Sequence, residues 1–91
     1  MLKIIRSKRF EKDIKLARKR KLDLTELNNV IMTLARGEKL AEKYKYHALS
    51  NNFKDFRECH IKPDWILIYA IDNKELELFL FRTGTHSDLF K

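Results

Sequence analysis

The spacing of apolar side chains changes from a helical period to a strand period near the middle of this 91-residue chain. Up to residue 37 the apolar positions recur three and four residues apart, which is typical of helices with one buried face. From residue 53 onward they alternate with polar residues or run continuously, as they do in strands. Helices before strands predict an α+β fold.

The N-terminal part predicts a strand and a first helix. Leu2, Ile4 and Ile5 form a short apolar stretch before Ser7, a residue type that caps helices. A helix is expected from about Lys8 to Arg20, with most of its basic residues on the exposed surface. Its apolar stripe consists of Phe10, Ile14 and Ala17.

A second helix is expected to start at Asp23, since Glu26 follows at the spacing of a capping box. Gly37 is placed to end it. Its apolar stripe consists of Leu24, Leu27, Ile31 and Leu34. The short connection predicts an antiparallel helix pair, and residues 40–46 form either a short third helix or an irregular crossing.

The second half predicts three strands in an antiparallel meander. The first begins near Phe53, and turns follow at Lys62-Pro63-Asp64 and Asp72-Asn73. Trp65 to Ile71 is apolar on both faces, as in a central strand, and a last strand runs from about Glu75 to Arg82. We therefore expect a small antiparallel sheet with an N-terminal strand, two helices on one face and the other face open.

Strict alternation along the last strand creates a conflict at Arg82. It places this guanidinium on the same face as Leu76, Leu78 and Leu80, where an unpaired charge would cost several kcal/mol. Either a bulge precedes Arg82 or the strand ends earlier, and we favour the bulge. The first strand places His60 with Glu58 and Phe56, on the face expected to be open, and Arg57, Cys59 and Ile61 on the other.

The net charge of +7 is distributed unevenly. Residues 1–46 hold 14 Lys and Arg against 6 Asp and Glu, a net +8, whereas residues 47–91 hold 6 against 7, a net −1. A basic surface attracts phosphate backbones. It also fits a solvated face or one that meets an acidic protein partner, so charge alone leaves these alternatives open.

The remaining composition predicts one domain, residues 1–91, in the cytoplasm. There is no secretory signal pattern and no apolar run approaching the ~20 residues of a membrane span. The single cysteine, Cys59, cannot form an intrachain disulfide and is expected to pack in the core. We expect no metal and no cofactor, since the sequence has no paired metal-ligand motif and no phosphate-binding glycine loop.

The three histidines, His47, His60 and His86, suggest acid–base chemistry. Imidazole exchanges protons near neutral pH. Cleaving RNA without a metal needs a base for the ribose 2′-OH, an acid for the leaving 5′ oxygen and a cation for the phosphate. Histidine, aspartate and arginine side chains can share these tasks, although three histidines in a chain of this length could equally be surface or structural residues.

Several segments together resemble YafQ-type toxins of the RelE/ParE toxin–antitoxin superfamily. The specific ones are HIKPDWILIY from His60, FRTGTH from Phe81 and the final Leu89-Phe90, while FEKDIKLARKR from Phe10 and YHAL from Tyr46 extend the similarity over nearly the whole chain. The resemblance implies a RelE-like fold. It also implies a ribosome-dependent endoribonuclease that enters the A site and cleaves messenger RNA without a metal by 2′-OH attack, leaving a 2′,3′-cyclic phosphate and a 5′-OH. The implied partner is a cognate antitoxin, with further assembly of the pairs left open.

The resemblance also carries residue roles. His86 matches the catalytic histidine and would donate the proton to the leaving oxygen, while Arg82 would neutralise the scissile phosphate. The other matched active-site positions are His60, Asp64 and His47. RNA contacts are expected from Phe90, which matches an aromatic that stacks on a base, and from Arg57 and Lys62. Trp65 is matched too, but its apolar strand favours a place in the core.

Two other functions remain open at this point. A ParE-like toxin would use a similar fold to inhibit DNA gyrase by binding. A non-catalytic RNA-binding module would use the same basic surface and cleave nothing. The set of histidines, aspartate and arginine favours the nuclease, because neither alternative needs it.

Overall fold

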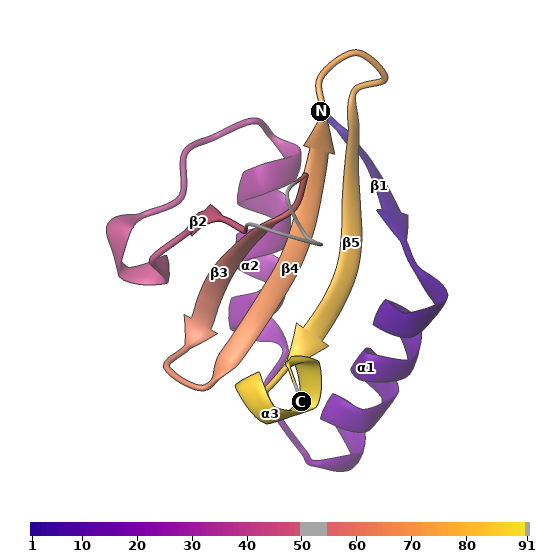
Figure 1. Cartoon of the computed structure of the whole chain (residues 1–91), viewed down its shortest axis with the longest axis vertical. Helices are drawn as coiled ribbons and strands as arrows, with labels where there is room; N and C mark the ends of the chain where they lie inside the picture. Colours follow the sequence, from indigo (N-terminus) through magenta and orange to yellow (C-terminus); the bar gives the residue numbers. More distant parts are fainter. Residues whose placement is uncertain (50–54, 91) are drawn as a thin grey trace.

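The strands form one five-stranded sheet in the order β1-β5-β4-β3-β2 (Figure 1). The computed structural model describes residues 1–49 and 55–90. The elements are β1 Lys3–Arg6, α1 Lys8–Lys19, α2 Thr25–Ala35, a 3-10 turn at Glu42–Tyr44, β2 His47–Ala48, β3 Arg57–Lys62, β4 Trp65–Asp72, β5 Glu77–Gly84 and α3 His86–Leu89. Strands β3, β4 and β5 form the predicted antiparallel meander. β1 pairs with β5 in parallel, a direction that the pattern did not specify.

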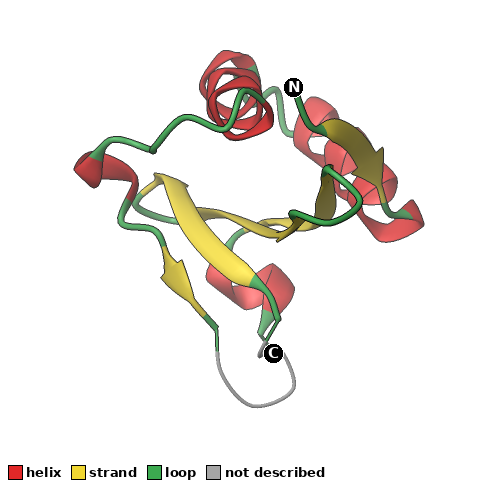
Figure 2. Ribbon diagram, turned by 90° about the horizontal axis from the view of Figure 1, so that it is seen from above, coloured by secondary structure: helices red, strands yellow, loops and turns green. Residues whose placement is uncertain are grey.

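Helices α1 and α2 cover one face of the sheet, as predicted (Figure 2). They run in opposite directions, α1 beside β5 and α2 behind the other strands (Figure 1). Their apolar stripes pack against one set of strand residues: Cys59, Ile61, Trp65, Leu67, Tyr69, Leu78 and Leu80. We call this side of the sheet the helix face. In the described part of the chain, no helix is both long enough and apolar enough to cross a membrane.

The first helix begins and the second ends as the sequence predicts. Ser7 is the N-cap of α1, and its hydroxyl accepts the Phe10 N–H at 2.9 Å. Gly37 has a φ of +74° and follows the last turn of α2, where its N–H donates to the Leu34 carbonyl. A left-handed backbone conformation at this point suits glycine, because glycine has no Cβ.

The predicted capping box at Asp23 is wrong. α2 begins at Thr25, and its N-cap is Leu24, so the helix starts later than that box requires. Asp23 accepts the Thr25 N–H instead, in a local turn. Glu26 does not reach back to the cap, since its carboxylate accepts the Tyr44 hydroxyl at 2.7 Å. The Tyr44–Glu26 contact between distant segments therefore takes the place of the predicted local pair of Asp23 and Glu26. The Tyr44 hydroxyl comes from the 3-10 turn, which is the short third helix that the sequence left open.

The last strand starts two residues later than predicted and ends later. Asp72 accepts the N–H groups of Lys74 and Glu75, which lengthens the turn. Leu76 then takes a φ of +55° and is 59% exposed, so it belongs to the turn and not to the apolar face. The two-residue strand β2, which pairs with β3, was not predicted. The expected strand start at Phe53 lies outside the described residues, and β3 begins at Arg57.

A bulge in β5 resolves the conflict at Arg82. Tyr69 lies opposite Leu80 and its neighbour Ile68 lies opposite Arg82, which leaves Phe81 as the extra residue. The bulge moves Arg82 off the helix face and brings Thr83 onto it. The preferred prediction from the sequence is therefore confirmed.

The second face of the sheet is not bare, contrary to the sequence prediction. Ile66 and Ile68 point to this face and are 3% and 1% exposed. The short helix α3 lies on this side (Figure 2). Aromatic rings also pack here, with the centroids of Phe56 and Phe81 4.9 Å apart. Apolar residues of a central strand need cover on both sides, and here rings and a single helical turn supply part of it.

Trp65 lies in the core, as its apolar strand predicts, and its indole is tied to β5. Its Nε1–H donates to the Thr83 hydroxyl at 2.9 Å, and this hydroxyl donates to the Ile66 carbonyl at 2.8 Å. Thr83 is 2% exposed. The hydroxyl therefore satisfies a buried donor and a buried acceptor, and links β4 to β5 at the end of the sheet nearest α3.

Replacing Thr83 with valine keeps the side-chain shape but leaves the indole N–H buried without an acceptor. We expect T83V to lower the free energy of unfolding by about 1–3 kcal/mol, measured by urea denaturation. The matched control is T33V, because the Thr33 hydroxyl donates to a carbonyl of its own helix at an exposed position. The control should change stability by less than about 0.5 kcal/mol. Equal losses in the two variants would contradict the role given to Thr83.

Candidate active site on the histidine face

Four side chains lie in one row across four strands. His47 of β2 is opposite Glu58 of β3, Glu58 is opposite Ile68 of β4, and Ile68 is opposite Arg82 of β5. All four point away from the helix face. We call this side of the sheet, marked by Glu58, His60 and Arg82, the histidine face. Neighbouring strands lie about 4.8 Å apart, so the row places an imidazole, a carboxylate and a guanidinium within a short span of one surface.

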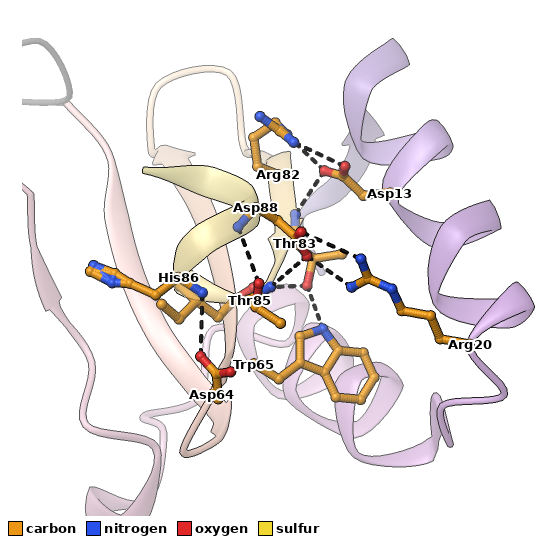
Figure 3. Close-up of polar contacts among 10 residues, drawn as sticks. Asp13, Arg20, Asp64, Trp65, Arg82, Thr83, Thr85, His86 and Asp88 are labelled. Carbon is orange, nitrogen blue, oxygen red and sulfur yellow. Dashed lines mark hydrogen bonds and ion pairs between the residues drawn. The ribbon is translucent and has the colours of Figure 1, made fainter. Parts of the chain in front are cut away.

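A second row begins with His60, which lies opposite Ile66, which in turn lies opposite Gly84. The chain leaves the sheet after Gly84 and turns into α3, of which His86 is the first residue. The His86 N–H is 3.4 Å from Oδ1 of Asp64, a long contact between α3 and the β3–β4 turn. Figure 3 shows His86 and Asp64 side by side, with the imidazole pointing away from the core. The turn and the helix thus bring His86 and Asp64 together at one end of the sheet.

His47 is held by two acceptors. Its Nε2 lies 2.7 Å from Oε1 of Glu58, and its Nδ1 lies 3.2 Å from the carbonyl of Lys45. A carboxylate and a carbonyl both accept, so the two contacts are satisfied together when both ring nitrogens carry hydrogen. In this arrangement both ring nitrogens of His47 are engaged by neighbouring groups.

Glu58 is a candidate that the sequence reasoning missed. Its side chain is 13% exposed and faces His47 across the β2–β3 pair. A signal for it was present, because alternation already placed Glu58 on the face of His60. What the pattern lacked was β2, a strand of two residues that carries His47 into contact with it.

Arg82 reaches the edge of the sheet, where it meets Asp13 of α1. Its Nε donates to Oδ2 of Asp13 at 2.8 Å and its Nη2 donates to Oδ1 at 3.1 Å (Figure 3). Hydrogen bonding to Asp13 raises the pKa of Arg82 above its usual value, so the guanidinium stays charged. The structure therefore supplies a fixed cation where β5 meets α1.

The helix that carries His86 is anchored through Asp88. This carboxylate accepts the Thr85 N–H at 3.0 Å, and the Thr85 hydroxyl accepts the Asp88 N–H, which makes a capping box. The Asp88 carboxylate also accepts a hydrogen bond of 2.9 Å from Nη1 of Arg20, the residue at the end of α1. Gly84 allows this close approach, because a Cβ there would lie 3.1 Å from the Asp88 side chain. The Arg20 bond and the Thr85 bonds lower the pKa of Asp88 to about 2.

Phe90 contacts the predicted catalytic imidazole. Its ring is 4.8 Å from that of His86, centroid to centroid, with the two planes nearly perpendicular. Edge-to-face contacts of this kind favour a defined ring orientation. Phe90 is therefore placed to orient His86.

The two predicted RNA-binding cations separate in the structure. Arg57 lies opposite Tyr69, on the helix face, and lines a surface pocket of about 460 Å³ with Leu2 and Tyr46. The structure does not bring it to the histidines, since odd-numbered residues of β3 point to the helices. Lys62 is exposed at the end of β3, and it lines a shallow pocket with His60.

Cys59 is buried in the core, as predicted, and burial raises its thiol pKa to about 12. Among residues 1–49 and 55–90, no group of three His, Cys, Asp or Glu side chains is placed to hold a metal ion.

Comparison with known proteins agrees with this architecture. Residues 2–91 match the family model described as bacterial toxin of type II toxin-antitoxin system, YafQ. The mRNA interferase toxin YafQ of Escherichia coli strain B / BL21-DE3 is 42% identical over 85 residues, which are 92% of this chain and 90% of that protein. A metal-bound toxin from Helicobacter pylori is 51% identical, with a TM-score of 0.93 over 99% of this chain and all of that one. The toxin in the E. coli DinJ-YafQ complex is 39% identical, with a TM-score of 0.91 over the full length of both chains.

The fold and the matches define a class, the bacterial toxins of type II toxin–antitoxin systems. Within that class, the chain belongs to the YafQ family. The resemblance inferred from the sequence motifs is thereby confirmed.

The lowered pKa of Asp88 makes its contribution to stability depend on pH. A carboxyl whose pKa is lower in the folded state than its ordinary 3.8 stabilises the fold above about pH 4, and this stabilisation is lost as pH falls toward 2. We expect D88N to be less stable than the parent protein by about 1 kcal/mol at neutral pH, with the difference disappearing between about pH 4 and pH 2. Urea denaturation over this range measures it.

The control for this prediction is E75Q, which removes an exposed carboxylate in the β4–β5 turn. Its stability relative to the parent should stay nearly constant over the same pH range. A D88N difference that persisted unchanged at pH 2 would show that the carboxylate charge contributes nothing to holding α3.

Proposed function

We propose that this protein is the toxin of a type II toxin–antitoxin pair and acts as an endoribonuclease on messenger RNA, without a metal. The observation that carries the proposal is that the strand register puts His47, His60 and Arg82 on one face of the sheet, and that His86 begins the short helix that follows β5 on that side. Membership of a family whose E. coli relative is named an mRNA interferase supports it.

The side chains present can perform each part of the reaction. His86, exposed at the start of α3, is assigned as the acid that protonates the leaving 5′ oxygen. His60 and Asp64 are assigned to proton transfer at the 2′-OH and to placing the reacting groups. Arg82 offsets charge on the phosphate, and His47 with Glu58 completes the polar row. The products of 2′-OH attack are a 2′,3′-cyclic phosphate and a 5′-OH.

RNA is proposed to meet the rim of the histidine face and not a flat, open sheet. The centre of that face is closed by apolar packing around Ile66 and Ile68, whereas His47 and His86 are exposed. Lys62 and Phe90 extend the surface with a cation and a ring for stacking. Ribosome-bound message in the cytoplasm is the proposed substrate, and the basic helix α1 would then face structured RNA.

A nuclease requires the histidines, whereas gyrase inhibition or simple RNA binding does not. We expect H86A and H60A each to lower the rate of message cleavage by about 100-fold or more, the usual contribution of an acid or base. Primer extension on message from expressing cells measures the cuts, and K74A, an exposed turn substitution, serves as the control. Growth arrest that survived the double variant H60A/H86A with message intact would eliminate the nuclease.

The proposed function also requires an antitoxin partner. The DinJ-YafQ complex of E. coli shows a relative bound to another protein, and the net +8 of residues 1–46 suits an acidic or extended partner segment. Purification from the native operon should yield a complex of two different chains. Recovery of this chain alone, at native levels and tolerated by its host, would contradict the proposed pairing.

A further inference from the structure

Asp13 is unlike the rest of the basic helix on which it lies. Its side chain is 11% exposed, whereas that of Glu11, the other acidic residue of α1, is 52% exposed. Asp13 is adjacent to the apolar stripe at Ile14 and faces β5. Its carboxylate accepts three hydrogen bonds, from Nε and Nη2 of Arg82 and from the Thr83 N–H. A largely buried carboxylate with this many donors is a built feature of the fold and not part of a solvated surface.

The place of Asp13 follows from how β1 and β5 pair. The register of β1 on β5 ends where Arg6 lies opposite Leu80. Beyond that point the Ser7 hydroxyl donates to the Phe81 carbonyl at 2.6 Å, and the Thr83 N–H donates to Oδ2 of Asp13 at 3.0 Å. Past the end of β1, the edge of β5 is therefore bonded by Ser7 and by the first turns of α1. This stretch of β5 contains the bulge that turns Arg82 to the histidine face.

The pair with Asp13 leaves part of the guanidinium available. Asp13 binds Nε and Nη2, and Nη1 takes part in neither bond. A guanidinium carries more N–H donors than these two bonds use, so the remaining ones can reach a phosphate oxygen while the other edge stays fixed. Donors held in place before the reaction stabilise developing charge better than mobile ones do.

We infer that Asp13 is a positioning residue for Arg82, which fixes the direction of the guanidinium toward the scissile phosphate. The inference rests on the proposed ribonuclease function. Asp13 touches no reacting atom in this role, and its effect on the reaction passes through Arg82. A carboxylate from the first helix thus orients a cation of the last strand.

The substitution D13N separates this role from simple support of the strand. An asparagine oxygen in the place of Oδ2 can still accept the N–H groups of Thr83 and of Arg82 Nε. Its amide nitrogen, in the place of Oδ1, is a donor and cannot accept from Nη2 of Arg82, and the negative charge is lost. We expect D13N to lower the rate constant for cleavage of a reporter message on programmed ribosomes by about tenfold, with little change in the toxin concentration that gives half the maximal rate. The control E11Q, on the same helix, should cleave within about twofold of the parent rate.

A double-mutant cycle tests whether Asp13 acts through Arg82. R82A alone should reduce cleavage more than D13N does, and D13N/R82A should equal R82A. If the two losses multiply instead, Asp13 acts independently of Arg82 and the inference is wrong. The melting temperature of each variant, measured in parallel, identifies any loss caused by unfolding.

A second measurement does not depend on activity or on any variant. In the ¹⁵N NMR spectrum, the Nε–H of Arg82 should exchange with water much more slowly than that of Arg9, an exposed arginine of α1. Equal exchange rates would overturn the role of Asp13 whether or not the protein cleaves RNA. Slow exchange in a protein that cleaves no message would contradict the proposed function while leaving the fixed guanidinium in place.

Discussion

The extra residue at Phe81 lets one strand serve a core and a reactive surface. Before the bulge, Leu78 and Leu80 point into the core, and after it Thr83 does so again. Without the added residue, Arg82 would fall on the helix face and would be buried with a cost of several kcal/mol unless paired. The bulge therefore reconciles an apolar strand with a charged residue near its end, and it sets which side chains of β5 face which way.

The residues around the bulge are held from α1, the helix at the opposite end of the sequence. Asp13 binds Arg82 and the backbone of Thr83, while Arg20 at the end of the same helix binds Asp88 of α3. These three contacts join residues 68 to 70 positions apart in the sequence. The basic helix α1 thus anchors the candidate site as well as supplying positive charge. The acidic residues in these contacts are Asp13 on α1 and Asp88 on α3.

The sequence was informative wherever structure depends on neighbouring residues. Ser7 and Gly37 were identified as helix boundaries because capping and left-handed turns are local, and alternation placed Glu58 and His60 on one face. It was misleading where a distant partner decided the outcome. Tyr44 draws Glu26 away from the predicted capping box. The turn at Asp72 is a different case, because it is local. Its side-chain contacts to the backbone remove Leu76 from the strand, and such contacts are not visible in a hydrophobic pattern.

The candidate site follows the same rule. Motifs pointed to the histidines and to Arg82, but Asp13 and Glu58 were not selected, because their roles depend on which strand or helix lies beside them. Arg57 shows the converse, since a cation close in sequence to His60 points to the other face of the sheet. Position along a strand, more than distance in sequence, decides which side chains can act together.

The parallel pairing of β1 with β5 also has a consequence for how the protein is made. The first strand of the chain lies against the last, so β1 has no partner until β5 has been synthesised. Contacts between such distant segments form late, because the intervening chain must first be ordered. A nascent chain that has formed α1 still lacks Arg82 and the helix that carries His86, so the pairs of α1 with β5 and α3 form only when synthesis is nearly finished.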